Sequence, residues 1–269
     1  MAKNKKVNRF DQLTENLTKE FLKIPNFNLV SENELANKVF NMTSFRMMEI
    51  ISYKELVCHS FIPAVNRSIF QSKTEVRNSS YKSLIDIDSF DFQETLYDTV
   101  RLAYVGLFHK LENYVNEVET ITSLIFKKEL FQTNVTISEW AKERFQFNLK
   151  DWRQFYVTSK INWICNCVKH KDGYPTKEPK PIGFQTIDES LRIKIKVDEF
   201  KRDCDSLIEL YPQYLILMRL IAMHKMIAEK PNFKTSGEFD VDLCVTQVES
   251  IAKLQIEIKK ILLLLQKAF

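Results

Sequence analysis

Hydrophobic residues recur every three or four positions along most of this 269-residue chain, and this spacing predicts amphipathic helices. In the N-terminal part, the pattern predicts helices over residues 8–23, over residues 31–41 and from residue 43 onward. Pro63 is expected to bend or end the third of these helices, because proline lacks the amide donor that a helix interior needs. Residues 71–81 are polar and predict a loop.

The second half of the chain continues the helical pattern. It predicts a helix over residues 91–119 with an extension toward 131, a short helix at 138–144, a helix over 151–173, an apolar helix over 198–230 interrupted at Pro212, and a last helix over 241–267. Only 4 Gly and 7 Pro occur in the whole chain, which favours long helices over a turn-rich β fold.

These patterns predict an all-α fold, a helical bundle of about seven helices. We expect a single domain over residues 1–269, with residues 1–90 as an N-terminal helical extension and residues 91–269 as the core bundle. One segment departs from the helical period. Apolar and basic residues alternate over residues 191–197, which predicts a strand with a basic face. With residues 184–187 it would form a small β-hairpin insertion near 184–197.

The predicted helix over residues 151–173 has two chemically different faces. One face is an apolar stripe, typical of packing on a core, made of Val157, Ile161, Ile164 and Val168. The opposite face carries polar side chains above one another along about three turns: Ser159, Asn162, Asn166, Lys169 and His170. A solvent-facing helix also shows a polar stripe. Asparagine, however, lowers helix propensity and offers paired donors and acceptors, which favours a recognition surface.

The end of this helix resembles the signature of HEPN domains, in the run NCVKH at residues 166–170 followed by KDG. These domains are small helical bundles, and many of them are metal-independent ribonucleases that pair as homodimers. The resemblance implies that His170 acts in acid/base chemistry, that Asn166 orients the scissile group and that Lys169 supplies positive charge. Cys165 stands where the signature has arginine, and a thiol cannot supply that permanent charge.

Two charged residues fall within the apolar stripe of the predicted helix over residues 91–119. They are Arg101 and Glu112, and charged residues on an apolar face tend to be paired or functional. In HEPN-like bundles the preceding helix packs beside the signature helix, so the resemblance implies that Arg101 could replace the missing arginine. Arg101, Glu112 and Asn162 are then candidate substrate-binding residues. A salt bridge of Arg101 or Glu112 within the core is the alternative.

Charge and cysteine content narrow the function classes. The net charge of +4 comes from 39 basic and 35 acidic residues, a balance too mild to indicate nucleic-acid binding by itself. Five cysteines without a CxxC pair fit reduced thiols in a cytoplasmic protein. The chain has no apolar run of about 20 residues, so we expect no membrane segment. No glycine-rich phosphate loop or histidine pair at metal spacing occurs, so neither a cofactor nor a metal is expected.

Two functional hypotheses follow. The first is a HEPN-like RNA-cleaving or RNA-binding protein, acting as a homodimer and as a toxin or anti-phage defence component. The alternative is a catalytically inactive HEPN-like module that binds a protein partner or small ligand in a defence or regulatory system. A third, purely structural reading has Asn162 and Asn166 satisfy buried backbone groups.

Overall fold

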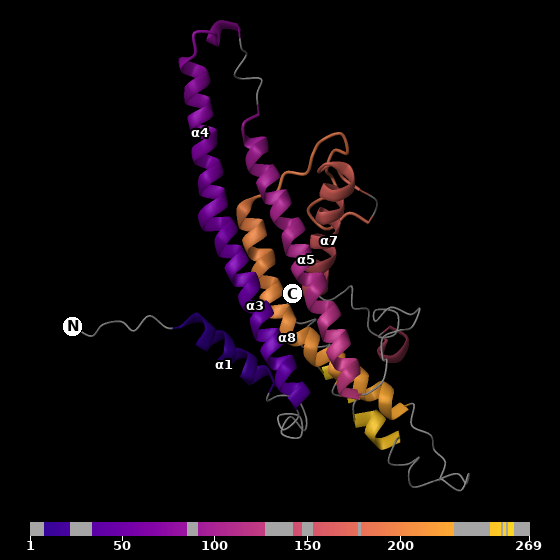
Figure 1. Cartoon of the computed structure of the whole chain (residues 1–269). Coiled ribbons are helices and arrows are strands. Elements are labelled where there is room, and N and C mark those ends of the chain that lie inside the picture. Colours follow the sequence, from indigo (N-terminus) through magenta and orange to yellow (C-terminus); the bar gives the residue numbers. More distant parts are fainter. Residues whose placement is uncertain are drawn as a thin grey trace, which may run out of the picture. The chain divides into compact units, whose positions relative to one another are not determined.

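The computed structural model describes residues 8–21, 34–84, 91–126, 142–146, 153–176, 179–228, 248–253, 255, 256 and 258–260. The elements in these residues are helical, which confirms the all-α prediction (Figure 1). They are α1 (Arg9–Phe21), α3 (Glu34–Leu56), the π-helical turn η1 (Val57–Phe61), α4 (Ile62–Asn78), the 3-10 turn η2 (Lys82–Leu84), α5 (Gln93–Phe126), α7 (Arg153–Lys171) and α8 (Val197–Ala228).

The chain folds into two compact units. Unit 1 takes Met1–Arg46, Asn113–Tyr156 and Glu209–Phe269, and unit 2 takes Met47–Glu112 and Val157–Ile208. Helices α3, α5, α7 and α8 therefore contribute residues to both units. The boundary expected at residue 90 lies inside unit 2, and the division into an extension and a core bundle stays a prediction.

Aromatic side chains hold α5 to α8 in unit 1. The rings of Tyr114 and Tyr211 stack with their centroids 3.8 Å apart, and the Tyr114 hydroxyl donates to the Tyr211 carbonyl at 2.5 Å. Burial raises the pKa of Tyr114, so its hydroxyl stays a neutral donor. On the same face of α5, Glu117 accepts two hydrogen bonds from Arg46 of α3, at 2.6 and 3.0 Å.

A second aromatic cluster joins α3, α5 and α8 in unit 2. The ring of Phe200 lies edge-on to Tyr104 at 5.4 Å and to Tyr53 at 6.2 Å. The Tyr53 hydroxyl donates to the carbonyl of Ala103 at 3.1 Å, and burial raises the pKa of Tyr53 to about 12. Helices α3 and α5 approach closely here, because a Cβ on Gly106 would lie only 2.2 Å from the Tyr53 hydroxyl oxygen.

The π-helical turn η1 lies just before Pro63, where the sequence pattern predicted that a helix bends or ends. Buried residues in α3 and α4 are spaced by seven positions, from Ile50 to Val57 and from Ile62 to Ile69, as two α-helical turns require. Between Val57 and Ile62 the spacing is five. Four positions would complete one α-helical turn, so this interval contains one residue more. A π turn accommodates that residue and keeps the buried side chains on one face, so the helical run continues through Pro63.

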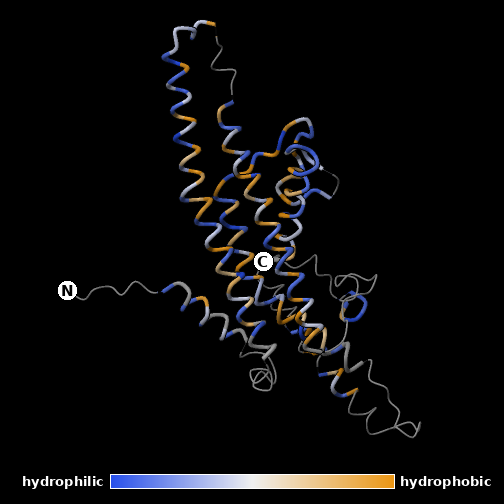
Figure 2. Tube along the Cα trace, viewed as in Figure 1, coloured by the Kyte–Doolittle hydropathy of each residue, from blue (hydrophilic) through white to orange (hydrophobic). Residues whose placement is uncertain are grey.

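Three sequence predictions are wrong where the structure shows continuous helix. No break separates residues 41 and 43, since α3 runs through both. The loop predicted at 71–81 is helical as far as Asn78, because its polar residues include the good helix formers Gln71, Lys73, Glu75 and Arg77. Helix α8 continues through Pro212. Figure 2 shows hydrophobic and hydrophilic positions alternating along these helices.

The predicted β-hairpin near residues 184–197 is also wrong. The described residues of this segment contain no strand, although its alternation is real: Ile193 and Ile195 are fully buried while Lys194 and Lys196 are exposed. The segment contacts other parts of unit 2 through Ile193, whose amide donates to the Gly173 carbonyl and whose carbonyl accepts from Arg101. The alternation therefore marks its buried side and does not indicate pairing with residues 184–187, which form turns.

Other helix predictions are confirmed. Helix α1 matches the prediction for 8–23, α5 that for 91–119 with its extension, and α7 that for 151–173, whose first two residues lie outside the described ranges. Residues 142–145 and the described residues of 248–260 are helical, and the rest of the helices predicted at 138–144 and 241–267 lies outside the described residues. Among the helices in the described ranges, none combines the length and apolar character that a membrane crossing needs.

Candidate functional site on helix α7

The polar face predicted for α7 is present at the surface of unit 2. Asn162, Lys169 and His170 are exposed and Asn166 is half-buried, while Ile161 and Ile164 on the other side are fully buried. The Asn166 amide nitrogen donates to the Asn162 amide oxygen at 3.2 Å. The two asparagines therefore pair with each other one turn apart, on the side of the helix away from the core.

Helix α5 borders this face through Phe108 and Glu112. The Lys169 ammonium lies 5.6 Å from the centre of the Phe108 ring, a cation–π contact. Glu112 is exposed, and His109 lies 3.5 Å from its carboxylate. The structure thus gathers Glu112 of α5 and Lys169 of α7 around one thiol, that of Cys165.

Cys165, for which the sequence resemblance predicted the place of an arginine, is fully buried. Burial raises the pKa of its thiol, and the charge of Glu112 raises it further. The nearby Lys169 opposes the shift through its charge and a hydrogen bond, but burial is the larger influence. The thiol therefore stays neutral near pH 7 and gives the site no charge.

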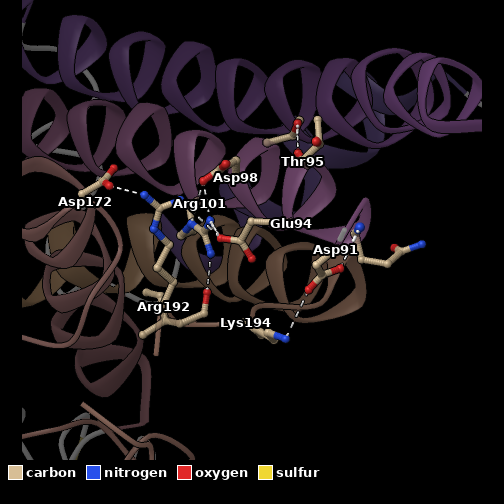
Figure 3. Close-up of polar contacts among 11 residues, drawn as sticks. Asp91, Glu94, Thr95, Asp98, Arg101, Asp172, Arg192 and Lys194 are labelled. Atoms are coloured by element: carbon tan, nitrogen blue, oxygen red, sulfur yellow. Dashed lines mark hydrogen bonds and ion pairs between the residues drawn. The ribbon is translucent and has the colours of Figure 1, made fainter. Parts of the chain in front are cut away.

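Arg101 is buried beside the end of α7 and belongs to an ion-pair cluster (Figure 3). Four hydrogen bonds hold its guanidinium: two from Nε and Nη2 to Asp98, one from Nη2 to Glu94, and one of 2.8 Å from Nη1 to the Ile193 carbonyl. Arg101 thus forms the salt bridge that was the alternative to a binding role, with its own side chain buried and those of Glu94 and Asp98 27% and 49% exposed. Sequence alone carried a signal for it, because Asp98 lies three residues before Arg101 on a helix.

The loop that ends α7 is built against Arg101. Asp172 and Gly173 both have positive φ, 52° and 86°, and the Gly173 amide donates to the carbonyl of Cys167 at 2.9 Å. A Cβ on Gly173 would lie 3.1 Å from Arg101 Cδ and Nε, so glycine serves both the backbone angle and the close approach. The carbonyl of Gly173 accepts from the Ile193 amide at 2.8 Å.

Acidic side chains neutralise much of the basic face predicted for residues 191–197. Arg192 pairs with Asp172 and lies 3.6 Å from Glu94, and Lys194 lies 3.6 Å from Asp91 (Figure 3). The two cations also lie over aromatic rings, each at 5.7 Å from the ring centre: Arg192 over Tyr174 and Lys194 over Tyr97. This segment therefore fixes the loop after α7 more than it adds positive potential.

A buried polar network links α7 to α8 and α5. Lys160 of α7 pairs with Glu199 at 2.7 Å and with Asp203 at 2.8 Å, and the Tyr104 hydroxyl donates to Asp203 at 2.6 Å. Lys160 and Asp203 are 7% and 6% exposed. Burial raises the pKa of Asp203, although Lys160 and Tyr104 both lower it. No local pattern predicts the partners of Lys160, because they come from a helix about 40 residues away.

Comparison of the chain with protein-family models, with curated proteins and with solved structures found no match in any of the three. In the described ranges, no group of three or more His, Cys, Asp or Glu side chains is placed to hold a metal ion.

Proposed function

We propose that this protein is a HEPN-like RNA-binding module, and that the polar face of α7 binds single-stranded RNA without cutting it. The observation that carries the proposal is the hydrogen-bonded pair of Asn162 and Asn166 on an exposed helix face, beside the cation of Lys169. Single-stranded RNA is read through hydrogen bonds to base edges, and amide side chains supply both donors and acceptors for such bonds. Lys169 would contact a phosphate.

Binding is favoured over cleavage because neither position to which the resemblance assigns arginine chemistry, Cys165 or Arg101, offers a free guanidinium at this face. Attack of a 2′-hydroxyl on the phosphate builds negative charge that a fixed cation would have to stabilise. Cys165 at the signature position is buried and neutral, and Arg101 is held by Asp98, Glu94 and the Ile193 carbonyl. Cys165 therefore carries no charge and Arg101 is engaged in ion pairs, so of the residues for which the resemblance implies positive charge only Lys169 stands at this face.

RNA cleavage is the second candidate, and one observation favours it. His170 is exposed at the end of α7, four residues after Asn166 and so one turn along the same face. This is the arrangement that acid/base catalysis by His170 needs. Homodimer formation, a protein partner and a role as a toxin or defence component are proposals that rest on the HEPN resemblance alone.

The test of binding is fluorescence anisotropy with a labelled single-stranded RNA of mixed sequence. Loss of the amide pair in Asn162→Ala with Asn166→Ala should weaken binding about tenfold, since two hydrogen bonds contribute about 1–3 kcal/mol together. Asn116→Ala removes another exposed asparagine, in the part of α5 that belongs to unit 1, and should leave the affinity unchanged. Equal affinities of the double variant and the wild type would refute the proposal.

A gel of the same RNA separates binding from cleavage. Under the proposal the RNA stays intact after incubation with the wild-type protein. Fragmentation that disappears in His170→Ala would replace binding by the second candidate, because the exposed His170 side chain can be removed without opening the core.

A further inference from the structure

Two cysteines far apart in the sequence lie on neighbouring helical elements of unit 2. Cys58 belongs to the π-helical turn η1, and Cys204 belongs to the second turn of α8. Cys204 is fully buried, whereas Cys58 is half-buried. Among the cysteines in the described ranges, only Cys58 is open to solvent, since Cys165 and Cys167 are buried as well.

Side-chain contacts between α3 and α8 bring the two thiols to the same level. Lys54, one helical turn before Cys58, pairs with Asp205 at 2.5 Å, and Asp205 directly follows Cys204. The rings of Tyr53 and Phe200 meet beside this pair, and Phe200 is one turn before Cys204. The side chains that flank Cys58 on α3 therefore contact those that flank Cys204 on α8.

The electrostatic surroundings of the two thiols agree with this placement. Lys54 and Asp205 influence the pKa of both thiols, and among the charges that act on Cys204 the largest influence is that of Cys58. Burial raises the pKa of both groups, most strongly at Cys204. Lys54 and Lys201 partly oppose the shift at Cys58, so Cys58 is the thiol that more readily forms a thiolate.

We propose that Cys58 and Cys204 form an intramolecular disulfide, linking η1 to α8, when a peroxide oxidises the protein. The Cys58 thiolate attacks one peroxide oxygen: an S–O bond forms, the O–O bond breaks, and the leaving hydroxide takes a proton to become water. The Cys204 sulfur then attacks the Cys58 sulfur. The S–S bond forms, the S–O bond breaks, and the hydroxide that leaves takes the Cys204 proton as a second water.

The burial of each thiol decides which of the two reacts with peroxide first. Peroxide meets the half-buried Cys58, whereas no outside thiol has access to Cys204. Because the two thiols are close enough for Cys58 to influence the pKa of Cys204, Cys204 is the neighbouring thiol that resolves a sulfenic acid on Cys58. The reaction is independent of RNA binding, because neither cysteine lies on the polar face of α7.

The test is mass spectrometry of the full chain after treatment with hydrogen peroxide and alkylation of remaining thiols. Trypsin releases Cys58 within residues 55–67 and Cys204 within residues 203–219, each as the only cysteine of its peptide. We expect these two peptides to be joined after oxidation and separate again after treatment with dithiothreitol.

Two variants and a control define the outcome. Cys58→Ser and Cys204→Ser should each abolish the joined peptide, whereas Cys165→Ser should leave it unchanged. If Cys204→Ser does not fold, Cys58→Ser still decides, because its side chain is only half-buried. Oxidation of Cys58 to sulfinic acid with Cys204 still reduced, or a link between different protein molecules, would overturn the proposal.

Discussion

Replacement of Lys160 by methionine tests whether the buried network really fixes α7. Methionine keeps the length and apolar stem of lysine but removes the ammonium that pairs with Asp203 and Glu199 at 2.8 and 2.7 Å. Asp203 would then keep only the hydrogen bond from Tyr104. A carboxylate that is 6% exposed would lose its counter-charge without gaining access to water.

The expected cost is about 3 kcal/mol in the free energy of unfolding at pH 7. Removing one partner of a buried ion pair typically costs about 3–5 kcal/mol. The lower end applies, because Tyr104 still donates to Asp203 at 2.6 Å and the Glu199 side chain is 26% exposed. A second substitution, Asp203→Asn, should recover much of the loss, since the amide oxygen can accept the Tyr104 bond without a charge.

The pH dependence of the cost has a definite sign. The folded-state pKa of Asp203 is raised by burial, and loss of Lys160 removes a charge that lowers it, so the pKa rises further. A raised carboxyl pKa contributes stability below its unfolded value of about 3.9, and this contribution is lost as pH rises through the folded pKa. The difference between variant and wild type should therefore be small near about pH 4 and largest near about pH 8.

Urea unfolding followed by circular dichroism measures these differences across the pH range. Lys194→Met is the matched control: the Lys194 side chain is 55% exposed and lies 3.6 Å from Asp91, so its loss should cost about 0–1 kcal/mol. A cost for Lys160→Met equal to that of the control, or one that does not grow with pH, would refute the buried-pair account.

The remaining predictions concern packing and the α7 loop. Gly106→Ala should lower the free energy of unfolding by about 1–3 kcal/mol, and with it the urea midpoint, because its Cβ would lie 2.2 Å from the Tyr53 hydroxyl oxygen. Adding Tyr53→Phe should recover part of this loss. An unchanged midpoint would contradict the close approach of Gly106 to Tyr53. Arg101→Met removes the donor to the Ile193 carbonyl and should speed native-state trypsin cleavage between residues 172 and 196, so an unchanged cleavage rate would argue against a fixing role. His170→Ala should change the unfolding free energy by less than about 0.5 kcal/mol, since its side chain is exposed, and a larger change would show that it packs in the core.

Most helices could be predicted from the local periodicity of apolar residues. Contacts between residues far apart in the sequence could not be predicted in this way. The face that carries Asn162 and Asn166 follows from their four-residue spacing, and the structure joins the two amides at 3.2 Å. The pairing of Lys160 with Asp203 depends on how two helices pack, which no local pattern reports. The π turn was not predicted, because a change in the spacing of apolar residues next to a proline, Pro63, also marks the end of a helix.

Ultraviolet cross-linking of the intact protein to single-stranded RNA tests directly whether the polar face of α7 contacts RNA, as we propose. Trypsin would release residues 161–169, which contain both asparagines of the pair, as one peptide. We expect RNA to be attached to this peptide and the attachment to be lost in Asn162→Ala with Asn166→Ala. Attachment only to peptides outside α7, or none at all, would contradict the proposal.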